Sequence, residues 1–344
     1  MSGHINIPIF IPHLGCPNCC VFCNQRTISG VDNFDIHSVK SIIEEHIRSS
    51  PGKEREIAFF GGSFTGIDRD LMISLLKTAY QYVENGDVTG IRCSTRPDYI
   101  DEEIVLILKK FGVRTVELGI QSVSDHVLLT SKRGHTLEAT QRACKLITQS
   151  GIDLVGQMMI GLPGSSIDDE IKTARFIVES GAVAARVYPT VVFKGTELCK
   201  MAIDGNYSPL TIEEAVTRSA IVCKLFYNNN VKIIRIGLCS SDSVLDDNNY
   251  YDGPMHPALG ELVENEIYYE IIKEKIYSLK ILNGAYLTVF IPRGATSKTV
   301  GQRKKNKIRL IDEFDIRELC FIEDDSIKAF DEISVQERKR TECT

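Results

Sequence analysis

The chain has 344 residues, of which 43% are hydrophobic and 25% are charged. These values are ordinary for a globular protein and allow one large α/β domain with a small appendage. No apolar run approaches the roughly 20 residues that a membrane-spanning helix needs, and the N-terminus lacks the pattern of a secretory signal. We therefore expect a cytoplasmic protein with no membrane partner. The net charge of −6 argues against a surface that is basic throughout, as in many nucleic-acid-binding proteins.

Short apolar runs alternate with longer amphipathic segments from residue 5 to about residue 237. This alternation predicts a parallel sheet covered by helices, in the form of a partial (β/α) TIM-like barrel of about six parallel β/α units. In such architectures the active site gathers at the carboxyl ends of the strands. The strand candidates are residues 5–11, 56–60, 90–94, 115–118, 154–160, 184–189 and 233–236, and the helix candidates are residues 36–48, 70–83, 101–111, 137–150, 168–180 and 211–228.

The pattern changes after residue 238. Residues 239–257 are rich in Ser, Asp, Asn, Gly and Pro, which indicates a loop near the barrel mouth. A helix is expected over about 258–279, a strand over 286–291, a basic helix over 297–310 and a last strand over 319–323. We therefore expect a barrel over 1–238, a loop and helix over 239–279, a small α+β unit over 280–325 and a charged, frayed tail over 326–344.

The chain contains eleven cysteines, and four of them fall within eight residues, at positions 16, 19, 20 and 23. The other seven are scattered singly along the chain and are expected to be mostly small buried hydrophobic residues. Nothing in the sequence indicates export, so disulfides are not the expected explanation for the group of four. This group therefore needs a chemical reason of its own.

Cys16, Cys20 and Cys23 form a C-x3-C-x2-C pattern directly after the first predicted strand. Thiolates are soft ligands that suit zinc or an iron–sulfur cluster. Structural zinc normally takes four protein ligands, and no second C-x2-C pair exists. Three thiolates on one loop leave a fourth iron open to a substrate that chelates it. Cys19 is expected to be a bystander, because adjacent cysteines are hard to aim at one cluster, although a zinc-binding loop remains an alternative.

The cysteine loop, with Phe22 before its third cysteine, resembles the cluster loop of the radical S-adenosylmethionine (SAM) superfamily. Residues 59–66, Phe-Phe-Gly-Gly-Ser-Phe-Thr-Gly, resemble the glycine motif at the end of the second strand in that family. Several later segments resemble the catalytic subunit of Elongator, and the resemblance spans roughly residues 5–265. These segments are 94–98 (Ser-Thr-Arg-Pro-Asp), 116–122, 132–136 (Lys-Arg-Gly-His-Thr), 161–164 (Gly-Leu-Pro-Gly), 186–190 and 194–198.

The resemblance implies a 4Fe-4S cluster on the three cysteines, S-adenosylmethionine as the second cofactor, and a 5′-deoxyadenosyl radical as the reactive species. It also implies an electron donor such as flavodoxin or ferredoxin. About 80 residues follow position 265, too few for the acetyltransferase domain of the Elongator subunit. We therefore expect an Elongator-like enzyme without acetyl transfer, of transferase or oxidoreductase type. The oligomeric state stays open.

The resemblance, together with positions at strand ends, implies a set of cofactor-binding residues. Glycines let the backbone approach the cofactor, and the guanidinium of Arg133 suits the carboxylate of SAM. Polar side chains at the ends of the third and fourth strands would hydrogen-bond the ribose or the methionine part. The set is Phe22, Gly61, Gly62, Ser94, Gln121, Arg133, Gly161 and Leu162.

Tyr188, Arg235 and His256 are the candidates for contact with the substrate, because they lie on late strands or on the loop that could cover the cavity. The most basic stretch, residues 297–309, weakly resembles a K-homology RNA-binding arrangement, although its second glycine is missing. Its candidate RNA-binding residues are Arg303, Lys304 and Lys305. Two enzyme classes stay open, an RNA-modifying enzyme acting on tRNA and an enzyme for a small metabolite or peptide. A non-enzymatic cluster- or metal-binding protein is the third alternative.

Overall fold

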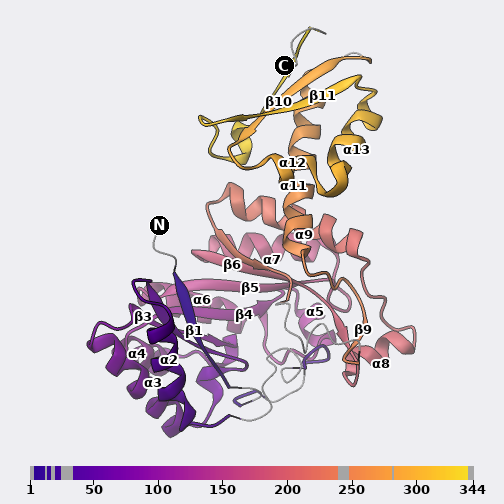
Figure 1. Ribbon diagram of the computed structural model, residues 1–344. Helices are drawn as coiled ribbons and strands as arrows, with labels where there is room; N and C mark the ends of the chain where they lie inside the picture. Colours follow the sequence, from indigo (N-terminus) through magenta and orange to yellow (C-terminus); the bar gives the residue numbers. More distant parts are fainter. Residues whose placement is uncertain are drawn as a thin grey trace. The chain divides into compact units, whose positions relative to one another are not determined.

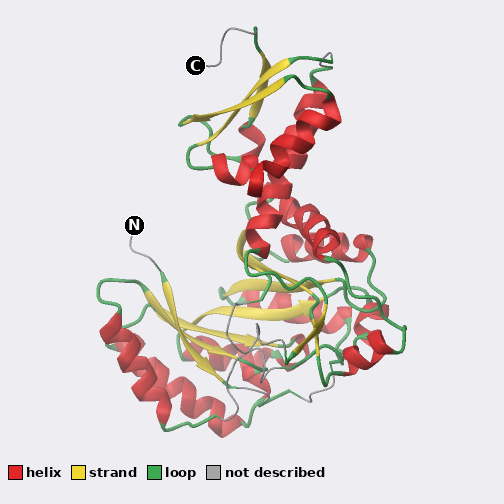
Figure 2. Ribbon diagram, turned by 45° about the vertical axis from the view of Figure 1, so that its right-hand side comes forward, coloured by secondary structure: helices red, strands yellow, loops and turns green. Residues whose placement is uncertain are grey.

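The computed structural model describes residues 4–11, 14–16, 20–24, 34–238, 248–280 and 283–339. The chain divides into two compact units (Figures 1 and 2). The first unit comprises residues 1–215 and 225–257, and the second comprises residues 216–224 and 258–344. No helix among the described residues combines the length and the apolar character needed to cross a bilayer.

The first unit is built on a seven-stranded sheet in which every neighbouring pair is parallel. The strands of this sheet follow one another in chain order, so that each lies beside the preceding strand of the sheet. The sheet therefore curls in one direction as a partial barrel (Figure 2). The prediction of a partial TIM-like barrel is confirmed. The strands, in sheet order, are β1 (Ile5–Phe10), β2 (Arg55–Phe60), β3 (Gly90–Thr95), β4 (Val113–Gln121), β5 (Asp153–Ile160), β6 (Ala184–Pro189) and β8 (Lys232–Ile236).

Helices pack against the outer face of this sheet through their apolar sides. Most begin at a side chain that caps the first turn, as when Ser166 and Asp169 form a reciprocal capping box at the start of α7. These helices are α2 (Ser38–Ser49), α3 (Arg69–Glu84), α4 (Glu102–Lys110), α6 (Leu137–Gln149) and α7 (Ile167–Glu179). The first unit also contains the short helices α5 (Asp125–Thr130) and α8 (Glu197–Ile203) and the 3-10 turns η1 (Phe64–Gly66) and η2 (Pro97–Tyr99). Helix α9 (Ile212–Asn228) is divided between the units, because its residues 216–224 fall in the second. Strands β7 (Val192–Phe193) and β9 (Tyr250–Asp252) form a separate antiparallel pair.

Side-chain alternation along the strands separates an apolar core from a polar inner face. In β1, Ile7 and Ile9 are fully buried, whereas Asn6, Pro8 and Phe10 line a cavity on the inner face. Because successive side chains of a strand point to opposite faces, the same strand serves both surfaces. The inner face can therefore carry a binding site while the side chains on the opposite face of the same strands form the apolar core.

The second unit packs α11 (Leu259–Ser278), α12 (Thr296–Val300) and α13 (Lys305–Phe314) with a three-stranded sheet of order β11-β10-β12. Strand β10 (Tyr286–Pro292) is parallel to β11 (Glu318–Asp324) and antiparallel to β12 (Ser334–Glu337). Its side chains Leu287, Val289 and Ile291 are fully buried. Two 3-10 turns, η3 (Gln302–Lys304) and η4 (Phe330–Glu332), complete the unit.

Three features of the second half differ from the sequence-based expectation. The basic stretch 297–310 is divided into α12 and α13, because Gly301, Arg303 and Lys304 take positive φ values of 76°, 52° and 62°. Helix α11, which the expectation grouped with the preceding loop over 239–279, belongs to the second unit. The expected frayed tail contains β12, whose Val335 pairs with Val289 of β10. Residues 239–247 of the expected loop lie outside the described residues.

Candidate active site

A cavity of about 600 Å³ lies over the inner face of the sheet in the first unit. Each of the seven strands contributes at least one lining residue, for example Phe60 of β2, Gln157 of β5 and Arg235 of β8. The curl of a parallel sheet brings these inward-facing side chains together although they are far apart in the sequence. We therefore compare the residues that line this cavity with the site residues predicted from the sequence.

Eleven of the predicted cofactor, metal and substrate residues line this one cavity. Three of the predicted residues, Gly161, Leu162 and His256, are not among its described lining residues. The eleven are Cys16, Cys20, Phe22, Cys23, Gly61, Gly62, Ser94, Gln121, Arg133, Tyr188 and Arg235.

The first cysteine is held against the glycine motif by a close backbone approach. Gly15 has a φ of 71°, and a Cβ placed on it would lie 2.3 Å from the carbonyl oxygen of Ser63. Only glycine fits there, both in conformation and in space. The approach brings the sulfur of Cys16 to 3.2 Å from the hydroxyl oxygen of Ser63.

The second half of the cysteine loop is fastened by two later segments of the chain. The backbone N–H of Val21 donates to the carbonyl of Ser131 at 3.1 Å, and the N–H of Leu198 donates to the carbonyl of Val21 at 2.8 Å. The Val21 side chain is buried with Val192 and Leu198, and Phe22 packs against the same group. These contacts fix the segment that carries Cys20 and Cys23.

Two arginines lie close to the cysteine sulfurs. Arg133 donates from Nη1 to the sulfur of Cys20 at 3.4 Å and from Nη2 to the carbonyl of Gly119 at 2.8 Å. Arg96 is paired with Asp98 through two hydrogen bonds of 2.9 and 2.8 Å. Burial lowers the pKa of Arg96, but Asp98 and the two cysteines Cys20 and Cys16 raise the pKa by more. Positive charge at this place favours negatively charged thiolate ligands.

The sequence reasoning missed Gly119, although the structure explains why it is a glycine. A Cβ at this position would lie 2.6 Å from Nη2 of Arg133 and 3.1 Å from the side-chain nitrogen of Gln121. The absent side chain therefore lets Arg133 cross the sheet edge toward Cys20. The signal in the sequence was its place directly after the predicted strand 115–118 and two residues before Gln121.

The lining residues fit an iron–sulfur cluster with an organic cofactor beside it. Gln121 is 5% exposed, has a φ of 64°, and its side-chain oxygen has no partner within the described ranges. Strained backbone and an unpaired buried oxygen are both costly and indicate a binding role. Among the described residues, no three His, Cys, Asp or Glu side chains converge on a single-ion position. The three sulfurs instead line a cavity far larger than one metal ion.

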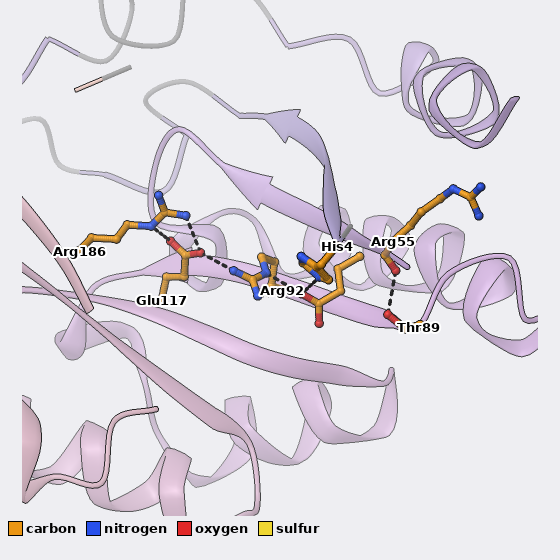
Figure 3. Close-up of polar contacts among 7 residues, drawn as sticks. His4, Arg55, Thr89, Arg92, Glu117 and Arg186 are labelled. Carbon is orange, nitrogen blue, oxygen red and sulfur yellow. Dashed lines mark hydrogen bonds and ion pairs between the residues drawn. The ribbon is translucent and has the colours of Figure 1, made fainter. Parts of the chain in front are cut away.

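A row of ion pairs, formed by His4, Glu56, Arg92, Glu117 and Arg186, crosses the strands of the sheet (Figure 3). The Glu117 carboxylate is 2% exposed and accepts from Arg186 at 2.7 and 3.0 Å and from Arg92 at 2.9 Å. Arg92 also pairs with Glu56, which in turn contacts His4 at 3.1 Å. Charged residues at inward positions of buried strands were the sequence signal for this row, and the sequence reasoning missed it.

The three predicted residues that do not line the cavity lie in the turn after β5 and on the segment before α11. The N–H of Gly161 donates to the Glu170 carboxylate at 2.7 Å, and the Tyr207 hydroxyl donates to the Gly161 carbonyl at 2.7 Å. Leu162 is buried in the same turn after β5. His256 lies between β9 and α11, on the segment that follows Gly253. A role for these three in cofactor or substrate binding stays a prediction.

The predicted RNA-binding residues lie together on a turn of the second unit. Residues 302–305 are all exposed; residues 302–304 form the turn η3 between α12 and α13, and Lys305 is the first residue of α13. Within the described part of the chain, no acidic side chain forms an ion pair with Arg303, Lys304 or Lys305, whereas their neighbours Lys298 and Arg309 pair with glutamates of α11. The turn therefore presents three positive charges to solvent.

The scattered cysteines that the structure describes inside helices and strands of the first unit behave as expected. Cys93, Cys144 and Cys199 are buried. Burial raises the pKa of Cys93 to about 12 and that of Cys144 to about 11. The thiols of Cys93 and Cys144 therefore stay protonated at neutral pH and are unsuited to metal binding. The described cysteines of the loop, in contrast, are half-exposed.

Comparison with known proteins agrees with this geometry. A family model described as the radical SAM superfamily matches residues 10–177, and a model of the radical SAM C-terminal domain matches residues 183–269. The chain belongs to the radical SAM superfamily, whose members use a 4Fe-4S cluster and S-adenosylmethionine.

Within that superfamily the chain is similar to Elongator-type proteins. It is 31% identical over 206 residues to the tRNA uridine(34) acetyltransferase of Methanocaldococcus jannaschii, covering 54% of this chain and 38% of the relative. It is 38% identical over 125 residues to the protein of the same name from Methanocaldococcus infernus, covering 36% and 23%. The fold is similar to that of the solved Elp3 of Methanocaldococcus infernus, with a TM-score of 0.63, 24% identity and coverage of 83% and 71%. The chain spans less than half the length of these two curated relatives.

The ion-pair row predicts a large effect of Glu117→Gln on stability. The change leaves Arg92 and Arg186 with one charge partner fewer in a buried place, so the free energy of unfolding should fall by about 3 kcal/mol. Urea unfolding at neutral pH measures it. The control is Glu103→Gln, because the Arg69–Glu103 pair is 42% and 72% exposed and should change stability by less than about 1 kcal/mol. Equal effects of the two substitutions would contradict the importance of the row.

His135 predicts a pH dependence of stability. Burial, then the nearby charge of Arg133, lowers the pKa of His135 to about 4 from its ordinary 6.5. The unfolded chain takes up this proton as the pH falls below 6.5, whereas the folded chain resists until about pH 4, so stability is lost across that window. The loss between pH 7 and pH 5 should be about 2 kcal/mol from this residue.

The measurement is the pH difference in unfolding free energy for the wild type and for His135→Gln. The substitution should shrink that difference, whereas His37→Gln, at an exposed position, should leave it unchanged. A pH difference that is the same in all three proteins would show that His135 is not the group responsible.

Proposed function

We propose that this chain is a radical SAM enzyme that modifies RNA, with tRNA as its substrate and with its 4Fe-4S cluster on Cys16, Cys20 and Cys23. The observation that carries the proposal is the single cavity lined by the three cysteines and by residues of all seven strands. When bound, the reduced cluster and S-adenosylmethionine supply a reductive cleavage of the sulfonium that gives a 5′-deoxyadenosyl radical.

In this proposal, the residues around the cysteines prepare the cavity for both cofactors. The three thiolates bind iron, and the guanidinium of Arg133, which donates to the sulfur of Cys20, stabilises the negative charge on sulfur. Gly61 takes a φ of 93° and, with Gly62, leaves backbone exposed where a side chain would otherwise stand. The unpaired oxygen of Gln121 is an acceptor for an amino or hydroxyl group of the cosubstrate.

The rest of the lining keeps water away from the reaction. Phe10, Phe22, Phe60 and Phe193 contribute an apolar wall to the cavity. Exclusion of water protects a reactive species from side reactions. The electron comes from a separate donor such as flavodoxin or ferredoxin.

The RNA part of the proposal rests on the second unit. Its turn stands between two helices that follow one strand and precede another, which is the arrangement around the Gly-x-x-Gly loop of K-homology domains. Gly301 occupies the first glycine position, and Lys304, with a left-handed φ of 62°, occupies the second. The exposed positive charges suit a phosphate backbone. The names of the two curated relatives, tRNA uridine(34) acetyltransferases, support tRNA and its uridines as the substrate.

Loss of one cluster ligand should abolish the reaction. Anaerobically reconstituted protein should contain about four irons per chain, show a broad visible absorbance and release 5′-deoxyadenosine on reduction with SAM present. Cys20→Ala should lose most of the iron and all of the product. Cys19→Ala, at a position outside the described residues, is the matched control and should retain both. Wild-type protein that fails to cleave SAM would overturn the enzymatic proposal and favour a cluster-binding scaffold.

Charge reversal of the turn should weaken RNA binding. Replacing Arg303, Lys304 and Lys305 by Glu should lower tRNA affinity by at least about tenfold. It should also reduce the slope of log affinity against log salt, by about 0.7 to 0.9 for each phosphate that the protein no longer neutralises. Filter binding over a salt series measures both quantities.

The control carries the same charge change elsewhere. Lys145, Lys172 and Arg175 are exposed on α6 and α7, and their replacement by Glu should change the affinity much less. Wild-type protein that does not bind tRNA, or binding that survives reversal of the turn, would contradict the RNA proposal. A small metabolite or peptide would then be the favoured substrate.

A further inference from the structure

The charges that line the cavity do not balance. Among the described lining residues are four arginines, Arg96, Arg133, Arg186 and Arg235, and one glutamate, Glu117. Arg96 is neutralised by Asp98, and Arg133 donates to the sulfur of Cys20. Arg186 is paired with Glu117, and Arg92, which shares that carboxylate, also has Glu56 as a partner. Arg235 on β8 is then the lining arginine left without an acidic partner among the described residues.

Arg235 is the least satisfied of these cations. Its side chain is half-buried, and the contact that the structure gives it is a long hydrogen bond of 3.5 Å from Nη1 to the carbonyl of Leu238. No ion pair joins Arg235 to an acidic side chain in the part of the chain that the structure describes. A half-buried guanidinium with one long hydrogen bond has donors left for a further acceptor, so this arrangement favours an anion from outside.

The sheet register adds further donors beside Arg235. Gly119, Gln157, Arg186 and Arg235 are direct partners across four neighbouring parallel strands. Their side chains therefore follow one another along the inner face, about 4.8 Å apart from strand to strand. Gly119 contributes no side chain, which leaves space at the cysteine end of this row.

Glu117 holds Arg186 in a fixed orientation within the row. Nε and Nη2 of Arg186 donate to the carboxylate, while Nη1 makes a long contact of 3.5 Å with the Tyr188 hydroxyl. The third nitrogen, Nη1, thus lies beside the Tyr188 hydroxyl, and both residues line the cavity. An arginine fork matches the two oxygens of a carboxylate or a phosphate. The fork of Arg186 is occupied by Glu117, so Arg186 offers an anion one hydrogen bond from Nη1, and the fork itself would come from Arg235.

We propose that Arg235, with Arg186 and Gln157 beside it, binds an anionic group of the substrate, either a carboxylate or a phosphate. The inference rests on the proposed function in one respect, since it takes this cavity as the reaction chamber. It adds the chemical class of the group that enters the chamber and the place where that group is held. The cysteine end then takes the cofactors, and the β6–β8 side orients the substrate.

The experiment uses the reconstituted, SAM-loaded protein and two pairs of probes. Uridine 5′-monophosphate against uridine tests a phosphate, and orotate against uracil tests a carboxylate. Equilibrium dialysis gives the affinity ratio within each pair. In the wild type, at least one anionic probe should bind about tenfold or more tightly than its neutral partner. The pair that shows the preference identifies the source of the anion.

Variants assign the preference to the residue. Arg235→Gln should bring the affinity ratio close to one, whereas Arg235→Lys, which keeps the charge but loses the fork, should retain a part of it. Arg175→Gln removes the same charge from an exposed position on α7 and should leave the ratio unchanged. Iron content and circular dichroism check that each variant is folded.

Two outcomes would overturn the inference. The first is the absence of any preference for an anionic probe in the wild type, and the second is a preference that survives Arg235→Gln. Because the probes are small, these results do not depend on tRNA binding. Failure of tRNA binding would count against the proposed function alone.

Discussion

The buried carboxylate of Glu117 is the interaction on which the inner face of the sheet depends. It lies on the central strand β4 and accepts hydrogen bonds from Arg92 of β3 and Arg186 of β6. An open parallel sheet that curls around a cavity has no second sheet to cover its inner face. Ion pairs between strands instead provide partners for the charged side chains of that face. They hold the arginines in defined orientations without filling the space between them.

The two ends of the cavity on this inner face differ in what holds their side chains. At the carboxyl ends of the strands, the cysteine loop is held by the Gly15 contact with Ser63 and by hydrogen bonds from segments near residues 131 and 198. Arg133 reaches the loop because Gly119 has no side chain. Deeper on the sheet, the charged row leaves one guanidinium, that of Arg235, without an acidic partner in the described part of the chain. These two arrangements are the basis for the proposed division of the cavity into a cofactor end and a substrate end.

The second unit contributes a different kind of surface. Asn306 is buried and donates from its side chain to the carbonyls of Asn265 and Thr299, which anchors the start of α13 to its neighbours. Gly301 lies against this side chain, since a Cβ there would be 3.0 Å from the Asn306 carboxamide carbon. The turn is thus supported from below while its basic side chains remain exposed. A phosphate backbone is recognised through charge and shape, which such a surface supplies.

The sequence by itself determined the parallel β/α order, the cysteine pattern and most of the strand-end residues, because hydrophobic period and residue spacing are local properties. It also predicted Gln121, Arg133 and Arg235 as site residues, which line the cavity. The ion-pair row, the role of Gly119 and the division of the basic helix at Gly301 were decided by the tertiary structure. Each depends on strand register or on a left-handed backbone, and these arise from partners that are distant in the sequence. Gly161, Leu162 and His256 are not among the described lining residues of the cavity, and their role stays a prediction, because a strand-end or loop position alone does not fix where a side chain lies.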